Sequence, residues 1–144
     1  MKIDRCSGSP NHKWYGLSLQ AMVVMTRSDC TCSSSEIAGL LHSEATLLRR
    51  VLAKLAKENL LETREGREGG YRLKKPADEI TLADVYCALQ VGDPLCNGMI
   101  DTTGFHPFGQ EMKAAFADIT SEIDQQIVSV LERYTIADLA ERTK

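Results

Sequence analysis

The side chains of this sequence best suited to chemistry are polar and basic groups clustered between positions 43 and 54. They are Ser43, Thr46, Arg49, Arg50 and Lys54. The last four fall within about two helical turns of one another, because an α-helix has 3.6 residues per turn. Basic groups there can contact phosphates, and an arginine near a helix start can reach the edge of a guanine. The segment therefore predicts a surface that contacts nucleic acid.

Apolar residues in the same segment predict the helices that hold these groups in place. Leucine and valine recur at spacings of three and four: Leu47, Leu48, Val51, Leu52 and Leu55. This stripe predicts an amphipathic helix over residues 44–57, with Ser43 before its start as a cap. A shorter helix is expected over residues 36–41, preceded by capping serines that include Ser34.

Two short extended runs follow, over residues 60–64 and 70–74, and a charged loop joins them. Glycines and arginines are interspersed around this loop: Arg64, Gly66, Arg67, Gly69, Gly70 and Arg72. Glycine permits backbone angles that a side chain would forbid, and an arginine-tipped loop suits a minor groove or its flanking phosphates. Two helices and a hairpin in this order are the winged helix-turn-helix plan, whose second helix enters a DNA major groove. A helix-hairpin unit with a solvated basic face is the plainer alternative, but the ordered set favours DNA binding.

Charge is distributed unevenly along the 144 residues. Positions 1–75 carry 13 Lys and Arg against 8 Asp and Glu, and positions 76–144 carry 4 against 12, giving net charges of +5 and −8. A basic half can meet a polyanion while an acidic half stays clear of it. No apolar run approaches the length of a membrane span and no secretory signal is visible, so a cytoplasmic protein is expected. No nucleophile–base pair or phosphate-binding loop in a strand-to-helix context indicates an enzyme.

Five cysteines, an odd number, argue against a disulfide framework. Cys30 and Cys32 form a C-x-C pair, whose spacing is poor for zinc and favours an exposed, reactive thiol pair. Cys87 is expected to be a small buried side chain within a helix over residues 82–89. The cysteines therefore predict thiol chemistry in preference to a metal site.

Further elements complete the expected chain. A first helix is expected over residues 12–27, with Met22 and Met25 as core side chains. Capping-box patterns open the helix over residues 82–89 and a short last helix: Thr81 with Asp84, and Thr135 with Asp138. The stretch 91–107 has two prolines and three glycines, and is expected to be an irregular loop suited to sensing.

A long helix is expected over residues 108–134. Apolar residues step along it by three or four: Met112, Phe116, Ile119, Ile123, Ile127, Val130 and Tyr134. The N-terminal part already supplies three helices for a core, so the first six of these residues are expected to pair with the same helix of a second copy. Such a homodimer sets two recognition helices one DNA turn, roughly 34 Å, apart.

The expected protein is mainly α, a winged helix-turn-helix domain with a long C-terminal dimerisation helix. We expect a flexible lead-in over residues 1–11 and the winged helix-turn-helix domain over residues 12–90. A sensor loop over residues 91–107 is expected to follow, and then the dimerisation helix and C-terminal helix over residues 108–144.

Several stretches of the chain resemble a known family. They are YGLSLQAM (15–22), EIA (36–38), LxxVLxxLxxxxLL (48–61), REGREGGYRL (64–73), EITLADV (79–85) and YTIADL (134–139). Over about residues 15–139 the chain is similar to the Rrf-type (IscR/NsrR/CymR-like) winged helix-turn-helix transcription regulators. The resemblance implies a homodimeric bacterial regulator that binds a palindromic operator in double-stranded DNA, and we expect a repressor.

The resemblance also implies roles for individual residues. By position it assigns base reading to Thr46, Arg49 and Arg50, and wing shape to Gly69, Gly70 and Tyr71. Glu65 departs from the pattern, because many members have arginine there, directly before the first wing glycine. The basic residues of this wing are instead Arg64 and Arg67.

A second departure concerns the cofactor. Cluster-binding members hold an iron–sulfur cluster with three cysteines in the loop after the helix that begins at Leu82, and this loop has Cys96 alone. A cluster needs roughly four ligands, so no cofactor or metal is expected. Cys96 and His106 are instead expected to sense thiol oxidation or a small molecule. The alternatives are an interaction module that binds a partner enzyme or metabolite, and a regulator with an atypical iron–sulfur cluster.

Overall fold

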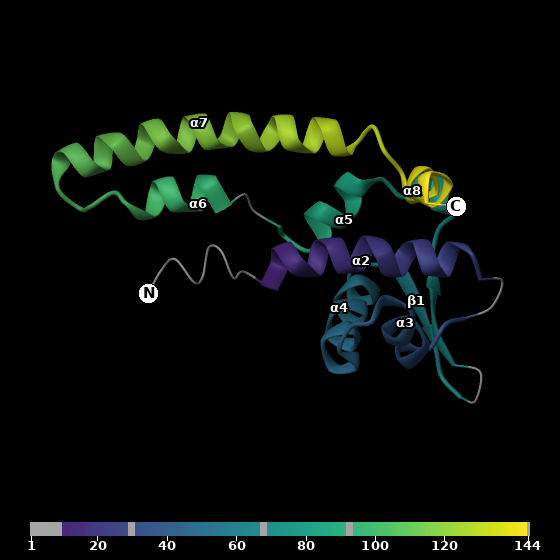
Figure 1. Ribbon diagram of the computed structural model, residues 1–144. Coiled ribbons are helices and arrows are strands. Elements are labelled where there is room, and N and C mark those ends of the chain that lie inside the picture. The colour runs from purple at the N-terminus through teal and green to yellow at the C-terminus, as the bar shows by residue number, and fades with distance from the viewer. Residues whose placement is uncertain (1–9, 29–30, 67–68, 92–93, 144) are drawn as a thin grey trace.

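Helices make up most of the protein, and one short hairpin interrupts them (Figure 1). The computed structural model describes residues 10–28, 31–66, 69–91 and 94–143. In chain order the elements are α2 (Pro10–Thr26), α3 (Ser34–Leu41), α4 (Ala45–Lys57), β1 (Leu61–Arg64), β2 (Gly70–Leu73), the 3-10 helix η1 (Ala77–Glu79), α5 (Leu82–Ala88), α6 (Pro94–Asp101), α7 (Pro107–Leu131) and α8 (Ile136–Arg142). The predicted class, mainly α with a winged helix-turn-helix, is confirmed.

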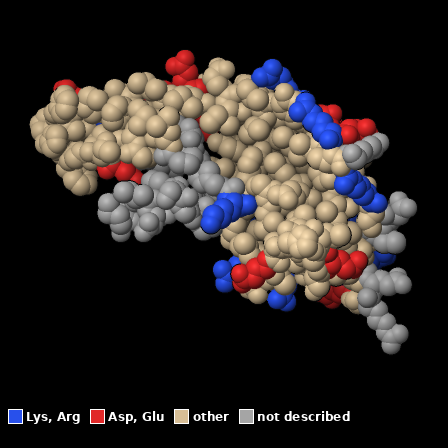
Figure 2. All heavy atoms as spheres, in the orientation of Figure 1, with Lys and Arg blue, Asp and Glu red and all other residues tan. Residues whose placement is uncertain are grey.

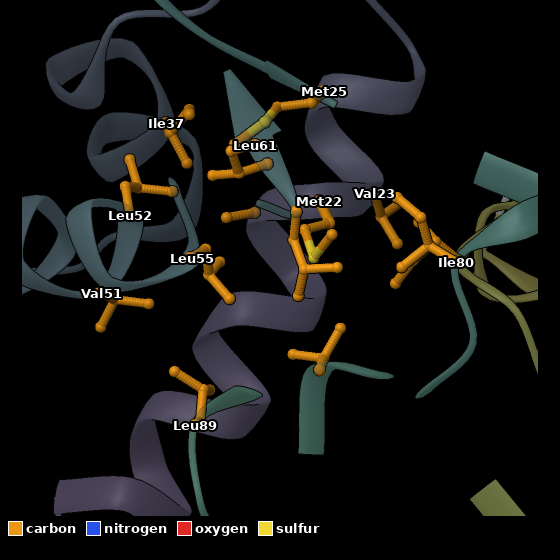
Figure 3. Close-up of a cluster of buried hydrophobic side chains, with 14 of the residues drawn as sticks. Met22, Val23, Met25, Ile37, Val51, Leu52, Leu55, Leu61, Ile80 and Leu89 are labelled. Atoms are coloured by element: carbon orange, nitrogen blue, oxygen red, sulfur yellow. The ribbon is translucent and has the colours of Figure 1, made fainter. Parts of the chain in front are cut away.

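The core is built around α2, which packs against α4, α5, α8 and strand β2. Met22 and Met25 lie among side chains from α3, α4 and β1 (Figure 3). Met22, Leu52 and Leu55 are fully buried, and burial of one such side chain contributes about 1.5–3 kcal/mol. The prediction that the two methionines belong to the core is confirmed.

Three helices begin with a side-chain hydroxyl that accepts a hydrogen bond from the third helical amide. The pairs are Ser33 with Glu36, Thr81 with Asp84 and Thr135 with Asp138, and each is a reciprocal capping box. Such a cap contributes about 1 kcal/mol, because it satisfies amides that have no partner inside the helix. The two predicted boxes of α5 and α8 are confirmed.

Three helices end with a left-handed residue that is not glycine. His42, Asn59 and Gln90 have φ angles of 52°, 67° and 53°. In each case the next amide donates to a carbonyl five residues back: Ser43 to Ala38 at 3.0 Å, Leu60 to Leu55 at 3.0 Å and Val91 to Tyr86 at 3.1 Å. This is the Schellman arrangement, which satisfies carbonyls at the helix end.

The Schellman turn after α3 explains why the prediction for Ser43 is wrong. The Ser43 amide closes α3, and α4 begins after Glu44 without a side-chain cap. The Ser43 hydroxyl is buried and has no hydrogen-bond partner among the described residues. Ser43, just before the apolar stripe of α4, therefore closes the C-terminal end of α3 and does not cap the N-terminus of α4.

An arm, residues 94–131, extends past the rest of the chain (Figures 1 and 2). The C-terminal part of α7 packs on α5, while its N-terminal part projects with α6 along its side. The prediction of an irregular loop over residues 91–107 is wrong in its middle, because Pro94–Asp101 forms α6. None of the described helices combines the length and apolarity needed to cross a bilayer.

After the arm, the chain returns to the core. The Leu82 amide donates to the Tyr134 carbonyl, and the Ile136 amide donates to the Ile80 carbonyl, both at 2.9 Å. Ile136 is fully buried, so α8 completes the same core that α2 and α4 begin. We call this core and its helices, with η1 and the hairpin, the body.

Candidate nucleic-acid interface

The exposed face of α4 carries the predicted base-reading residues. Thr46, Arg49 and Arg50 are exposed, whereas the opposite face of α4 is fixed in the core by four fully buried residues: Leu48, Val51, Leu52 and Leu55. No carboxylate among the described residues forms an ion pair with Arg49 or Arg50. Lys54 is half-buried and its ammonium lies 3.6 Å from the Glu58 carboxylate. The two arginines, together with the exposed Lys57 in the last turn, are therefore the cations of α4 available to an anionic partner.

The two predicted serines occupy the ends of α3. Ser34 is the first residue of α3 and is half-buried, and the cap itself is its neighbour Ser33. Ser43 is half-buried and turns its hydroxyl inward, as described above. Ser34 therefore lies at a helix start, where amides can meet a phosphate, while the Ser43 hydroxyl faces the protein.

The hairpin places its basic residues unequally. Strands β1 and β2 pair antiparallel, with Glu62 opposite Arg72, and the two side chains form an ion pair. Arg64 is exposed at the end of β1, and Arg67 lies outside the described residues. Of the two described wing arginines, Arg72 is paired with Glu62 and Arg64 forms no ion pair with a described carboxylate.

Steric demands at the hairpin explain two of its glycines. A Cβ at Gly70, whose φ is 151°, would lie 2.4 Å from the Cys32 carbonyl oxygen. A Cβ at Gly69 would lie 2.3 Å from the Arg64 carbonyl oxygen. Both contacts are with backbone atoms that cannot rotate away, so only glycine fits these positions.

A backbone bridge between Cys32 and Tyr71 attaches the wing to the loop before α3. The Tyr71 amide donates to the Cys32 carbonyl at 2.7 Å, and the Cys32 amide donates to the Tyr71 carbonyl at 2.9 Å. Cys32 is buried, so the prediction that it belongs to an exposed thiol pair is wrong, and Cys30 lies outside the described residues. The sequence signal for this bridge was the glycine preceding Tyr71, which permits the close approach of the two backbones.

On the face shown in Figure 2 the projecting arm carries acidic side chains and no basic ones, whereas Lys and Arg lie over the body, with Asp and Glu among them. A polyanion is therefore repelled by the arm, and the cations that could attract it lie on the body.

This arrangement of helix pair, exposed arginines and pinned wing matches a known family over nearly the whole chain. Residues 14–142 fit the model of the Rrf2 family, described as iron-dependent transcriptional regulators. The chain belongs to the Rrf2 family. It is a transcriptional regulator with a DNA-binding winged-helix fold, a class distinct from enzymes.

Individual relatives are similar at modest identity. YffB of Lactococcus lactis subsp. lactis (strain IL1403), by name an HTH-type transcriptional regulator, is 24% identical over 131 residues, which are 88% of this chain and 84% of that protein. The fold is similar to that of T. potens IscR, with a TM-score of 0.67 and 20% identity over 94% of this chain and 86% of that one. It is also similar to CymR of B. subtilis, titled the global cysteine regulator, with a TM-score of 0.65 and 20% identity over 94% of this chain and 96% of that one.

The predicted sensor residues of this Rrf2 protein lie on separate elements of the arm. Cys96 belongs to α6, and its side chain lies outside the described ones. His106 caps α7, because its Nδ1 accepts a hydrogen bond from the Gly109 amide at 3.0 Å. A Cβ at Gly109 would lie 2.4 Å from the Gly104 carbonyl oxygen, so the turn before α7 is tightly closed. Sequence reasoning missed this capping role, although Pro107 directly after a potential cap is a helix-start signal.

Iron, which the family description names, finds no site among the described side chains. The prediction that Cys87 is buried is wrong, because its thiol is exposed on α5. Cys32 is buried under the wing, and His106 caps α7. No three His, Cys, Asp or Glu side chains in the described part of the chain come together as metal ligands. These residues do not form the four-ligand site that a cluster requires.

The predicted dimerisation residues of α7 lie in three environments, two of which share Ile127. Met112 and Phe116 are half-buried and line a hollow at the turn between α6 and α7. Ile127 packs against the core of the body. Ile119 and Val130, which are 48% and 40% exposed, line a groove of about 390 Å³ on α7 together with Ile123 and Ile127. The apolar seam is therefore only partly covered by the chain itself.

Proposed function

We propose that this Rrf2 protein is a homodimeric repressor that binds a palindromic operator and carries no iron–sulfur cluster. The main support is the exposed face of α4. Arg49 and Arg50 lie there together with Thr46, and neither arginine forms an ion pair with a carboxylate of the described residues. Arginine at this place on a recognition helix contacts phosphates or guanine edges. The wing adds Arg64, Gly69, Gly70 and Tyr71 to the contact surface.

The groove on α7 supports the proposal of a dimer. It is lined mainly by isoleucine and valine, together with Glu122 and Gln126, and apolar surface of this kind is costly to leave in water. A second copy of the same groove, related by a two-fold axis, buries both surfaces at once. Such a two-fold dimer would present two α4 helices to successive major grooves of one duplex.

Binding to DNA tests the first part of the proposal. Fluorescence anisotropy across a series of salt concentrations, on an operator selected from random sequence, gives both the affinity and the number of phosphate contacts. The double variant Arg49→Gln, Arg50→Gln is expected to weaken binding at least about tenfold and to flatten the salt slope. Lys113→Gln removes a cation from the arm and is expected to change neither. Equal affinity of the double variant and the wild type would refute the interface.

Sedimentation tests the dimer. Ile123→Glu places a charge in the groove and is expected to give monomers with much weaker operator binding. Ser121→Glu adds the same charge at an exposed position of α7 away from the groove, and dimers are expected to persist. Dimers of both variants would show that the groove is not the interface.

We further propose that the signal enters through residues 91–107. The Cys96 thiolate attacks one oxygen of hydrogen peroxide; the S–O bond forms as the O–O bond breaks, giving a sulfenic acid and a hydroxide ion, which takes a proton from solvent to become water. Because α6 lies along α7, a change at Cys96 would move the arm and the spacing of the two α4 helices. Peroxide is expected to weaken operator binding by the wild type and by Cys87→Ser, but not by Cys96→Ser. An identical response of all three proteins would exclude thiol sensing at Cys96.

A further inference from the structure

Two adjoining hollows lie on the side of the body between α2, α3 and α8. The hollow next to α8, of about 320 Å³, has apolar walls that include Leu19, Val23 and Leu139. The hollow next to α3, of about 510 Å³, includes Ile37, Leu40 and Glu36, whose carboxylate accepts a hydrogen bond from the Ser33 amide at the start of α3. Val24, Arg27 and Leu41 line both, so the two hollows adjoin along the C-terminal half of α2.

One cation stands at the junction of the hollows. The Arg27 Nη2 group donates to the Ala140 carbonyl at 3.1 Å and to the Thr143 hydroxyl at 2.8 Å. A guanidinium has five N–H donors, and those of Nε and Nη1 have no acceptor among the described residues. No described carboxylate pairs with it either. The end of α8 therefore fixes the Arg27 head in place and leaves one edge of it open.

The volume and lining of the hollows indicate the chemical class of a ligand. Small-molecule sites measure about 300–1,000 Å³ and combine apolar walls with a few fixed polar groups. A guanidinium edge matches a carboxylate, with which it forms charge-assisted hydrogen bonds. We infer that these hollows bind a small organic acid, whose apolar part lies against Val24 and Leu41 and whose carboxylate meets Arg27.

The site joins the two parts of the chain on which DNA binding depends. Leu40 and Leu41 belong to α3, which forms the helix pair with α4. Leu139 and Thr143 lie in and after α8, which directly follows the arm. A ligand that contacts both sides favours one spacing of α3 and α8, and so shifts operator affinity. This regulatory consequence rests on the proposed function, whereas binding of the acid does not.

Calorimetry on the full chain without DNA tests the site, with 4-phenylbutyrate, octanoate and indole-3-acetate as probes. At least one is expected to bind saturably, one per chain, with a millimolar dissociation constant typical of so small a ligand. The uncharged alcohol with the same hydrocarbon skeleton as the acid is expected to bind more weakly. Saturable binding by none of the three acids, or equal binding of acid and alcohol, would overturn the inference.

Variants separate the charge from the apolar walls. Arg27→Gln is expected to weaken binding of the acid about fivefold, as for an exposed ion pair, and to abolish the preference over the alcohol. Arg27→Lys is expected to restore that preference. Val24→Phe fills the shared space and is expected to abolish binding with Arg27 intact. Arg142→Gln, which removes a cation lying over the Tyr134 ring outside both hollows, is expected to change nothing. Circular dichroism checks that each variant is folded, and full binding by Val24→Phe would contradict the location.

Operator binding in the presence of a saturating acid tests the regulatory consequence separately. The dissociation constant for the operator is expected to change several-fold with wild type and to stay constant with Val24→Phe. An unchanged operator affinity of the wild type would refute the coupling, while the calorimetry decides the site itself.

Discussion

Replacing Gly70 with alanine is expected to detach the wing from the body. A Cβ at this position would lie 2.4 Å from the Cys32 carbonyl oxygen and 2.9 Å from the Ser33 amide nitrogen. Both neighbours are backbone atoms, so the clash is relieved only if the bridge between Cys32 and Tyr71 opens. The φ of 151° at Gly70 adds strain for any residue that has a Cβ.

The expected loss of stability can be estimated from the hydrogen bonds of the bridge and from the backbone strain at position 70. Its two hydrogen bonds, of 2.7 and 2.9 Å, contribute about 0.5–1.5 kcal/mol each. Alanine in this glycine-favouring backbone region adds about 1–3 kcal/mol. The free energy of unfolding of Gly70→Ala should therefore fall by about 2–6 kcal/mol, a large part of the stability of a small domain.

Urea unfolding followed by circular dichroism measures this difference, and hydrogen exchange at the Tyr71 amide reports the bridge directly. Gly39→Ala is the matched control, because Gly39 is exposed on α3 and a Cβ there meets nothing within 4 Å. That variant should be as stable as the wild type or more so, by up to about 1 kcal/mol. A Gly70→Ala protein within about 0.5 kcal/mol of the wild type, with Tyr71 still protected, would refute the reasoning.

Three further predictions concern the helix ends and are checked by the same unfolding measurement. Gln90→Gly should raise the free energy of unfolding by about 1 kcal/mol, because glycine adopts the left-handed conformation freely. Gln20→Gly, inside α2, should lower it by a similar amount. A loss of stability in both variants would show that Gln90 is not strained. His106→Ala should cost about 1 kcal/mol by removing the acceptor of the Gly109 amide, and His106→Asn should recover most of it; equal stability of the two variants would argue against the cap. Ser43→Ala should be neutral or stabilising by up to about 1 kcal/mol, since the buried hydroxyl has no described partner, and a clear loss would reveal one.

Sequence reasoning predicted the elements whose signals are local. The apolar stripe of α4 and the threonine caps of α5 and α8 depend on spacing within one segment, and they hold in the structure. Ser43 shows the limit of that approach. A serine between two helices can cap the second or close the first, and the left-handed conformation of His42 decides for the first.

Burial of single residues was harder to predict, because it depends on segments far apart in the chain. Cys32 is buried because Tyr71, 39 positions later, pairs with it, while Cys87 is exposed because α5 turns its other face to α2 and α7. In α7 the same apolar periodicity serves two purposes. Ile127 both packs on the body and lines the open groove, whereas Ile119 lies in the groove without packing on the core, and nothing in the spacing distinguishes them.

The return of the chain to the body after α7 bears on how the protein is made. The Ile80 carbonyl, near the middle of the sequence, accepts its hydrogen bond from the Ile136 amide, and Thr81 forms a β-bridge with Thr135. These contacts can form only after α8 has been synthesised. During synthesis the α3–α4 pair and the wing leave the ribosome long before α8, so the body cannot be finished until α8 has emerged. Folding of the DNA-reading part is therefore expected to be completed only after α8 has left the ribosome, and a ribosome stalled within α7 should display an unfinished, protease-sensitive nascent chain.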